Sequence, residues 1–370
     1  MTYPVYAYGH DYGNSETSAV ISGRGVRVEY SIPSITADGT WQEAETAARG
    51  LGKQVTDLLE DNHCLLSYDL RTPSGWRTVE KYLGQTVFDF GKKAQETRGD
   101  ISRYWSNGYS REMLMGLSGL ILHDQEYGLH VVTGLPIATF QADPSHAEKV
   151  QQALLGDHSF RLNGRERLVH VESVKVIMEG AGALIAYGTT ADQLQGVVDI
   201  GGRTTDLFVA KGQRPRAALC KGEPLGVAAA ADKFNARFQS RFGRPLSLET
   251  RLELMRQYVK QRPYTPVLDN RREHVSSEDL NDMIGASLRE VGQAIATFVA
   301  TAWTDNEAGD VATDLTSILL VGGGAHYFAQ DIQTRLPHAT LVKKPEMANA
   351  QGYANLAEIV ATRARLTRVS

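Results

Sequence analysis

Apolar and polar positions alternate in short runs near the start of the chain, which is typical of half-buried strands. Residues 5–10 predict a first strand, and residues 20–21 lie in a second one that follows a turn at residues 11–14. Residues 24–32 continue this pattern as a third strand. Further along, short apolar runs predict strands at residues 64–69, 129–133, 174–178, 197–200, 205–210, 318–321 and 340–342. The Asn163-Gly164 pair predicts the turn of a hairpin.

Other segments repeat their apolar residues every three to four positions, as amphipathic helices do. The most regular stripe is Leu280, Ile284, Leu288, Val291, Ile295 and Phe298. Ser276 or Ser277 begins this helix, because acidic residues follow in its first turn; core packing is the expected role of the stripe. Further helices are predicted at residues 44–59, 111–123, 145–155, 180–187, 226–242 and 349–365. Helices that alternate with strands predict an α/β fold.

Composition narrows the class of protein. The chain has 370 residues, enough for two or three domains with a large core. Its formal net charge is −4 at pH 7, which gives no general attraction to nucleic acid or anionic membranes. Two cysteines exclude a disulfide scaffold and a cysteine-rich zinc site. No apolar run reaches the ~18 residues of a membrane span, and no signal peptide is recognisable, so we expect a cytoplasmic protein.

Two predicted hairpins share one pattern. Asp11-Tyr12-Gly13-Asn14-Ser15 follows an apolar strand, and so does Asp199-Ile200-Gly201-Gly202-Arg203. The two aspartates are 188 residues apart, about half the chain. This offset predicts two related domains that each offer one hairpin to a shared cleft.

Such hairpins suit phosphate chemically. Glycines allow a tight turn and a close approach of the backbone, so that successive N–H groups point at phosphate oxygens. Hydroxyl groups add small donors. An aspartate cannot bind phosphate, but it can hold hydrated Mg²⁺, which bridges to phosphate oxygens. Gly322-Gly323-Gly324-Ala325 forms a third small-residue loop between a strand and a helix, where a ribose or base fits against the backbone.

Rival nucleotide motifs fit less well. The sequence has no Gly-x-x-x-x-Gly-Lys-[Ser/Thr], which excludes a Walker-type loop. Glu179-Gly180-Ala181-Gly182 resembles the start of a dinucleotide fingerprint, but Ile185 stands at its third glycine position. A single Asp-x-Gly turn is often only a turn. Two hairpins and a glycine loop in this order are therefore needed to indicate a phosphate site.

In these residues the chain resembles the actin-like ATPase superfamily. Residues 11–15, 198–206 and 320–325 are similar to its phosphate-1, phosphate-2 and adenosine motifs. The closer resemblance is to bacterial ParM/StbA-type proteins, which segregate plasmids, and residues 131–136, 174–182, 225–227 and 348–353 support it. It covers essentially the whole chain and is weak at residues 33–107 and 240–275, which would be outer subdomains.

The resemblance implies a site and its cofactors. Asp11 and Asp199 would hold Mg²⁺ through water, and Glu179 and Asp199 would be catalytic, with Glu179 positioning or deprotonating the attacking water. ATP is the expected nucleotide, with GTP as the alternative. The nucleotide-binding residues would be Asp11, Gly13, Asn14, Ser15, Gly201, Gly202, Thr204, Gly226, Gly322, Gly323, Gly324 and Ala325. Lys233 and Arg237 are either base-side contacts or part of a solvated helix face.

It also implies a domain plan. Domain I would span residues 1–188, with an inserted outer subdomain at about 33–107, and a C-terminal helix at about 349–370 would pack back on it. Domain II would span residues 189–348, with an outer subdomain at about 232–276. The expected fold is thus α/β and actin-like, with two related domains around a nucleotide cleft.

The function expected from this resemblance is a filament-forming ATPase that segregates plasmid DNA. Its partners would be copies of itself and a DNA-bound adaptor, so the chain need not bind DNA directly. The alternative is a non-polymerising, sugar-type kinase of the same superfamily. A membrane-tethered division protein of the FtsA kind is disfavoured, because residues 361–370 lack a bulky apolar face. A heat-shock-type chaperone would need a longer chain.

Overall fold

The chain divides into two units, which are considered one at a time. Unit 1 consists of Met1–Ala186 and Met347–Ser370, and unit 2 consists of Tyr187–Glu346. The structure, a computed structural model, describes residues 3–59, 63–92, 101–106, 108–188, 192–303 and 314–369. Among these residues no helix combines the length and hydrophobicity that crossing a bilayer requires.

Unit 1 is built on one large mixed sheet. Within the described residues it has nine strands in the order β3-β2-β1-β7-β9-β8-β5-β6-β4. The bounds are β1 Val5–Asp11, β2 Glu16–Gly23, β3 Val26–Pro33, β4 Thr36–Asp38, β5 Cys64–Thr72, β6 Gly75–Leu83, β7 Glu126–Leu135, β8 Gly156–Leu162 and β9 Arg165–Met178. β5 pairs with β8, so the strands between residues 33 and 107 extend the same sheet.

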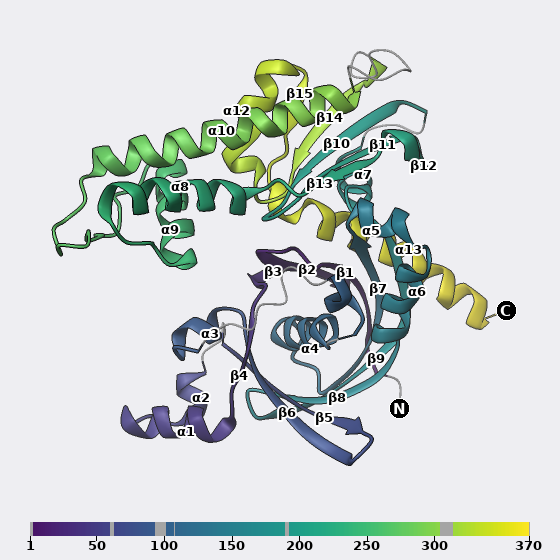
Figure 1. The fold of residues 1–370 in the computed structure, drawn as a ribbon. Helices are drawn as coiled ribbons and strands as arrows, with labels where there is room; N and C mark the ends of the chain where they lie inside the picture. The colour runs from purple at the N-terminus through teal and green to yellow at the C-terminus, as the bar shows by residue number, and fades with distance from the viewer. Residues whose placement is uncertain are drawn as a thin grey trace. The chain divides into compact units, whose positions relative to one another are not determined.

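Helices cover both faces of this sheet. The helical elements of unit 1 are α1 Trp41–Gly50, α2 Val55–Leu58, α3 Gln85–Asp89, η1 Ile101–Tyr104, α4 Tyr109–Ile121, α5 Ile137–Ala142, α6 Ser145–Leu154, α7 Ala181–Tyr187 and α13 Ala348–Val369. The sheet curves around α4 (Figure 1), and the α4 side chains Met113 and Leu117 share its core with Tyr8 on β1. On the opposite face, α13 places Tyr353 and Ala357 against Ala7 and Val132. Alternate residues of β1 therefore enter different cores.

Unit 2 has a smaller sheet with a related plan. Its main strand order is β12-β11-β10-β14-β15, and β13 pairs with β11. The bounds are β10 Leu194–Ile200, β11 Thr205–Lys211, β12 Arg214–Pro215, β13 Lys221–Glu223, β14 Ser317–Val321 and β15 Ala339–Leu341. In unit 1, β1 forms a hairpin with β2 and runs parallel to β7. In unit 2, β10 forms a hairpin with β11 and runs parallel to β14.

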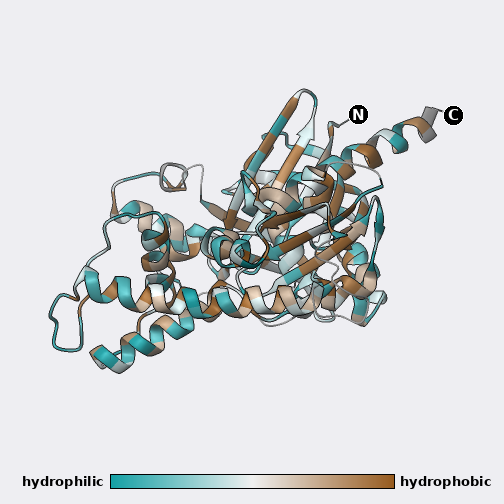
Figure 2. Ribbon diagram, turned by 90° about the horizontal axis from the view of Figure 1, so that it is seen from above, coloured by the Kyte–Doolittle hydropathy of each residue, from teal (hydrophilic) through white to brown (hydrophobic). Residues whose placement is uncertain are grey.

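The helices of unit 2 pack on this sheet and on one another. They are η2 Ala217–Leu219, α8 Val227–Phe242, α9 Leu248–Val259, α10 Ser277–Trp303, α12 Ala325–Arg335 and η3 Pro345–Met347. The backbone N–H of Asp279 donates to Ser276 Oγ at 3.1 Å, which confirms Ser276 as the cap of α10. In the predicted stripe all residues are buried except Phe298, which is partly buried. Strands are mainly apolar and helices alternate between polar and apolar stretches (Figure 2), as expected for amphipathic helices.

Two local predictions had different outcomes. Asn163 and Gly164 form the turn between β8 and β9 with φ of 50° and 79°, which confirms the predicted hairpin. The single helix predicted at residues 44–59 is wrong, because α1 ends at Gly50 and α2 starts at Val55. Gly52 has a φ of 67°, and the N–H of Lys53 donates to the Ala48 carbonyl at 2.9 Å. This is a Schellman ending, for which a left-handed glycine is well suited.

Candidate functional site

The first hairpin turns its carbonyl groups into unit 1. The Tyr12 carbonyl accepts from Arg103 Nη2 at 3.1 Å. Ser34 holds two others, because its Oγ donates to the Gly13 carbonyl at 2.6 Å and its N–H donates to the Ser15 carbonyl at 2.9 Å. Among the described residues, the N–H groups of Gly13, Asn14 and Ser15 donate no hydrogen bond. The loop therefore presents unpaired donors, as an anion-binding turn does.

Asp11 ends β1 on the face that α13 covers. Asn349 hydrogen-bonds to its carboxylate. Burial raises the pKa of Asp11 to about 7, although the Asn349 hydrogen bond and the nearby charge of Arg103 both lower it. A carboxylate that is short of solvent in this way is stabilised by an added cation, so Asp11 fits the metal-holding role expected from the sequence.

Asn349 joins α13 to a second part of unit 1. Its Oδ1 accepts from the N–H groups of Gly180 and Ala183, both at 3.1 Å. These donors belong to the start of α7, so the side chain caps that helix. The sequence motif at residues 348–353 contained Asn349, but its link to Asp11 and α7 required the folded chain.

Glu179 lies directly after β9. Because β1, β7 and β9 are mutually parallel neighbours, their carboxyl ends meet at one edge of the sheet. Asp11 and Glu179 are therefore at the same edge. The Glu179 N–H donates to the Leu135 carbonyl at 2.9 Å, and its charge interacts with Arg103. The structure thus brings the residues predicted in unit 1 to one end of its sheet.

The second hairpin repeats the arrangement of the first in unit 2. The Gly201 N–H donates to the Thr204 carbonyl at 2.8 Å and closes the turn. The first turn of α8 then holds two of its carbonyls, with Val227 N to Gly201 O at 3.3 Å and Ala228 N to Gly202 O at 2.8 Å. In the described part of the chain, the N–H groups of Gly202 and Arg203 donate no hydrogen bond.

Gly226 has a packing role in this hairpin. A Cβ there would lie 2.6 Å from the Gly201 carbonyl oxygen and 2.9 Å from the backbone of Arg203. Both distances are well inside ordinary contact, so only glycine lets α8 approach the turn this closely. A contact between Gly226 and the nucleotide is not tested by this packing and stays a prediction.

The glycine loop lies against the end of β10. The Gly324 N–H donates to the Ile200 carbonyl at 2.7 Å, and the Gly322 N–H donates to the Pro345 carbonyl at 2.8 Å. Gly322 has a φ of 80°, and a Cβ on it would overlap the Asp199 carboxylate. Since β10 and β14 are parallel neighbours, Asp199 and this loop meet at one sheet edge, and Asp199 is only 7% exposed.

Lys233 and Arg237 lie elsewhere in unit 2, on the side of α8 that faces α10. Lys233 Nζ is 2.5 Å from Glu290 Oε1, and Arg237 Nη2 is 2.8 Å from Glu290 Oε2. Arg237 Nη1 also donates to Ser287 Oγ at 3.0 Å. With Arg241 they line a cavity of about 640 Å³. Both cations thus share the single Glu290 carboxylate, and a base-side contact remains a prediction.

Arg103 was not predicted from the sequence. Its side chain is 2% exposed, yet it contacts the loop after Asp11 and lies near both predicted carboxylates of unit 1. No motif could have identified it, because residues 33–107 carried the weakest resemblance. A signal was present only in the neighbouring aromatic residues, Tyr104 and Tyr109, whose rings flank the guanidinium.

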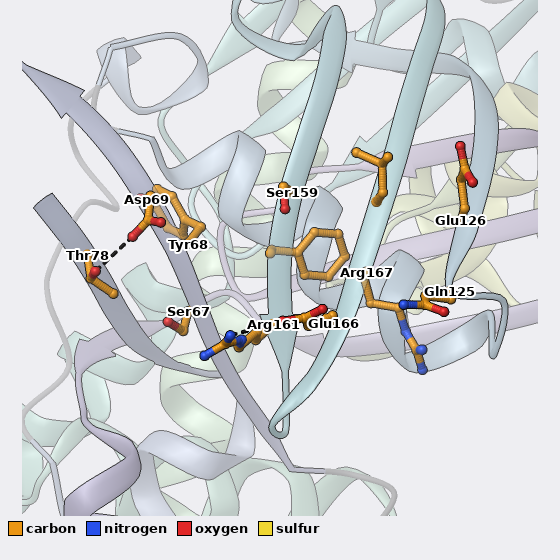
Figure 3. Close-up of a pocket in the computed structure, with 12 residues that line it drawn as sticks. Ser67, Tyr68, Asp69, Thr78, Gln125, Glu126, Ser159, Arg161, Glu166 and Arg167 are labelled. Atoms are coloured by element: carbon orange, nitrogen blue, oxygen red, sulfur yellow. Dashed lines mark hydrogen bonds and ion pairs between the residues drawn. The ribbon is translucent and has the colours of Figure 1, made fainter. Parts of the chain in front are cut away.

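A separate cavity of about 630 Å³ lies over β5, β8 and β9 in unit 1 (Figure 3). Two pairs of its polar side chains are hydrogen-bonded to each other. Thr78 Oγ1 donates to Asp69 at 2.7 Å, and Arg161 Nη2 donates to Glu166 at 2.9 Å. This cavity is lined almost entirely by strand residues and is not built on a turn like those of the two hairpins. Nor do three or more His, Cys, Asp or Glu side chains gather as a metal cluster anywhere among the described residues.

Comparison with known proteins places two family models on this chain. Residues 9–182 match the model of the actin-like proteins N-terminal domain, and residues 197–334 match that of the archaeal actin homologue MreB-like C-terminal domain. No curated protein sequence matches the chain.

Solved structures show the same fold at low identity. A 15-stranded ParM filament from Clostridium botulinum has a TM-score of 0.72 at 19% identity, covering 96% of this chain and 99% of the other. Ta0583, an archaeal actin homologue, has a TM-score of 0.70 at 19% identity with the same coverage. Bacillus thuringiensis ParM with ATP has a TM-score of 0.66 at 12% identity, covering 97% and 99%. The predicted fold class is confirmed.

Proposed function

Because this chain belongs to the actin-like protein family, we propose that it binds a nucleoside triphosphate with Mg²⁺, hydrolyses it and assembles into filaments of its own copies. One observation carries the nucleotide part. In both hairpins the carbonyl groups are hydrogen-bonded inward, while successive N–H groups remain unpaired among the described residues. Such a row of donors recognises phosphate.

In this proposal each unit contributes its own hairpin to phosphate binding. Gly13, Asn14 and Ser15 of unit 1 and Gly201, Gly202 and Thr204 of unit 2 bind the phosphate groups. Gly322 to Ala325 bind the ribose and base. ATP is the proposed nucleotide, since a ParM with ATP shares this fold, and GTP is the alternative.

The chain also fits a divalent cation. Asp11 is a partly buried carboxylate with a raised pKa, and Asp199 is a nearly buried carboxylate. Both are hard oxygen ligands of the kind that Mg²⁺ prefers, and they would hold it through water. When bound, the ion would neutralise negative charge on the phosphate oxygens.

Glu179 is the proposed residue for the attacking water. It lies at the same sheet edge as Asp11, and a carboxylate there can accept the proton of the water or orient the water by hydrogen bonding. Asp199 would act with it by orienting water on the metal. Positioning and charge neutralisation are the main requirements of phosphoryl transfer.

We further propose that assembly serves DNA segregation, with a DNA-bound adaptor as the partner. A ParM filament is among the structures that share this fold over nearly the whole of both chains. Direct binding of this chain to DNA is not required, and its net charge of −4 offers no general attraction to it.

The test is right-angle light scattering of the purified chain on addition of Mg-ATP, with phosphate release measured in parallel. We expect a rise in scattering that EDTA and Asp199→Ala both abolish, and filaments in negative-stain micrographs. A flat trace with steady phosphate release would contradict assembly and retain hydrolysis. Phosphate transfer to a small-molecule acceptor would instead indicate a kinase.

A further inference from the structure

Arg103 is a buried cation with few of the contacts that usually stabilise one. Its side chain is 2% exposed. Nη2 donates to the Tyr12 carbonyl at 3.1 Å and to Tyr104 Oη at 3.0 Å. The guanidinium carbon lies 4.8 Å from the ring centre of Tyr104 and 5.4 Å from that of Tyr109. All of these partners are neutral.

The positive charge is therefore incompletely compensated. Within the described residues Arg103 forms no ion pair, and its Nη1 is buried without a hydrogen-bond partner. Burying an unpaired charge costs several kcal/mol. A buried charge with this cost indicates a role for the charge itself. The charged groups near Arg103 are Asp11 and Glu179.

Arg103 also fixes the shape of the first hairpin. By holding the Tyr12 carbonyl, it fixes the backbone directly before the unpaired N–H groups of residues 13–15. Neighbouring contacts keep Arg103 in place, because Ser110 Oγ donates to the carbonyls of Arg103 and Tyr104 at 3.1 and 2.8 Å. Tyr12 Oη in turn donates to the Ser110 carbonyl at 2.9 Å.

We propose that Arg103 is a positioning residue for phosphoryl transfer: it holds the loop at residues 12–15 and supplies a fixed positive charge beside Asp11 and Glu179. This inference rests on the proposed ATPase function. The charge compensates the two carboxylates as the negatively charged triphosphate arrives, and the hydrogen bond keeps the phosphate-facing donors aligned. Preorganised charge of this kind acts mainly on the transition state.

The expected effect is larger on kcat than on KM. Arg103→Ala should lower kcat by about a hundredfold, the lower end of the ~10²–10³-fold loss typical of removing one preorganised donor, and should raise KM for Mg-ATP by a smaller factor. Millimolar guanidinium should restore activity to this variant, whereas urea, a neutral molecule of similar shape, should not. Arg111→Ala is the matched control, because Arg111 also lies over a tyrosine ring of unit 1, that of Tyr68, and should retain wild-type activity.

A second pair of variants addresses folding. If Arg103→Ala fails to fold, Arg103→Lys should keep more kcat than Arg103→Gln, because lysine retains the charge. Equal kcat for the two variants, or equal rescue by guanidinium and urea, would overturn the role of the charge. A fully active Arg103→Ala would overturn the inference and leave the proposed function intact. A wild-type chain that releases no phosphate from Mg-ATP would overturn both.

Discussion

Gly182→Ala tests how tightly α13 packs on unit 1. In an open helix this change stabilises a protein by up to about 1 kcal/mol, because alanine is the better helix former. Here a Cβ would lie 2.5 Å from Tyr353 Cε1 and 2.7 Å from the Asn349 carbonyl oxygen, where ordinary contact begins at 3.4 Å. The obstacles must therefore move by most of an ångström.

Neither obstacle can move freely. Tyr353 is fully buried against Ala7 and Val132, and Asn349 caps α7. Overpacking of this kind costs about 1–3 kcal/mol, so packing outweighs helix propensity. We expect a net loss of about 1–2 kcal/mol, which corresponds to roughly 2–8 °C in Tm for a domain of about 150–250 residues.

The assay is thermal and urea denaturation of the variant beside Gly50→Ala. Gly50 ends α1 in the same unit, and a Cβ there meets nothing within 4 Å, so this control should be neutral or slightly stabilising. If Gly182→Ala proved as stable as Gly50→Ala, the close packing of α7 on α13 would be refuted.

Three further predictions concern other parts of the chain. Gly322→Ala should lower the free energy of unfolding by about 1–3 kcal/mol, because a side chain is strained at a φ of 80°. Gly323→Ala is the control and should not lower it, because a Cβ at Gly323 meets open space. Equal denaturation midpoints for the two variants would contradict this prediction. Ser276→Ala should lower the free energy of unfolding of unit 2 by about 1 kcal/mol through loss of the α10 cap, as measured in urea; an unchanged midpoint would count against the cap. At His170, burial lowers the pKa, but hydrogen bonds to Asp157 and Glu126 outweigh burial, so the pKa is raised in the folded protein. The protonated imidazole therefore stabilises the fold at low pH, and this stabilisation is lost as the pH rises through the pKa of His170 in the folded protein. Wild type should therefore exceed His170→Gln in stability more at about pH 5 than at about pH 9, and a constant difference would refute the assignment.

The hairpins could be predicted because their signals are local. Gly13, Gly201 and the Asn163–Gly164 pair each mark a turn between apolar runs, and turn chemistry depends on only a few neighbouring residues. The parallel pairing of β1 with β7 and of β10 with β14 then brings distant motifs to common sheet edges. Order along the chain was enough to identify these motifs.

The missed features depend on contacts between distant residues. Arg103 gains its position from Tyr12, which lies 91 residues earlier, and Asn349 reaches Gly180 across 169 residues. The ending of α1 was different, because Gly50 and Gly52 carried a local signal that the apolar periodicity of residues 44–59 obscured. Lys233 and Arg237 likewise pair with Glu290, which lies more than 50 residues later and on another helix, so no local pattern predicts this pairing.

The path of the chain through its two units has a consequence for how the protein is made. Unit 2 is inserted between α7 and α13, so the ribosome completes all of it before the helix that covers β1 and β7 emerges. Until then Ala7, Val132 and Gly182 lack their partners, and unit 1 exposes an apolar face while unit 2 can already fold. A nascent chain in this state is a natural client for chaperones that recognise exposed apolar surface. Unit 1 therefore cannot complete its packing until after all of unit 2 has been synthesised.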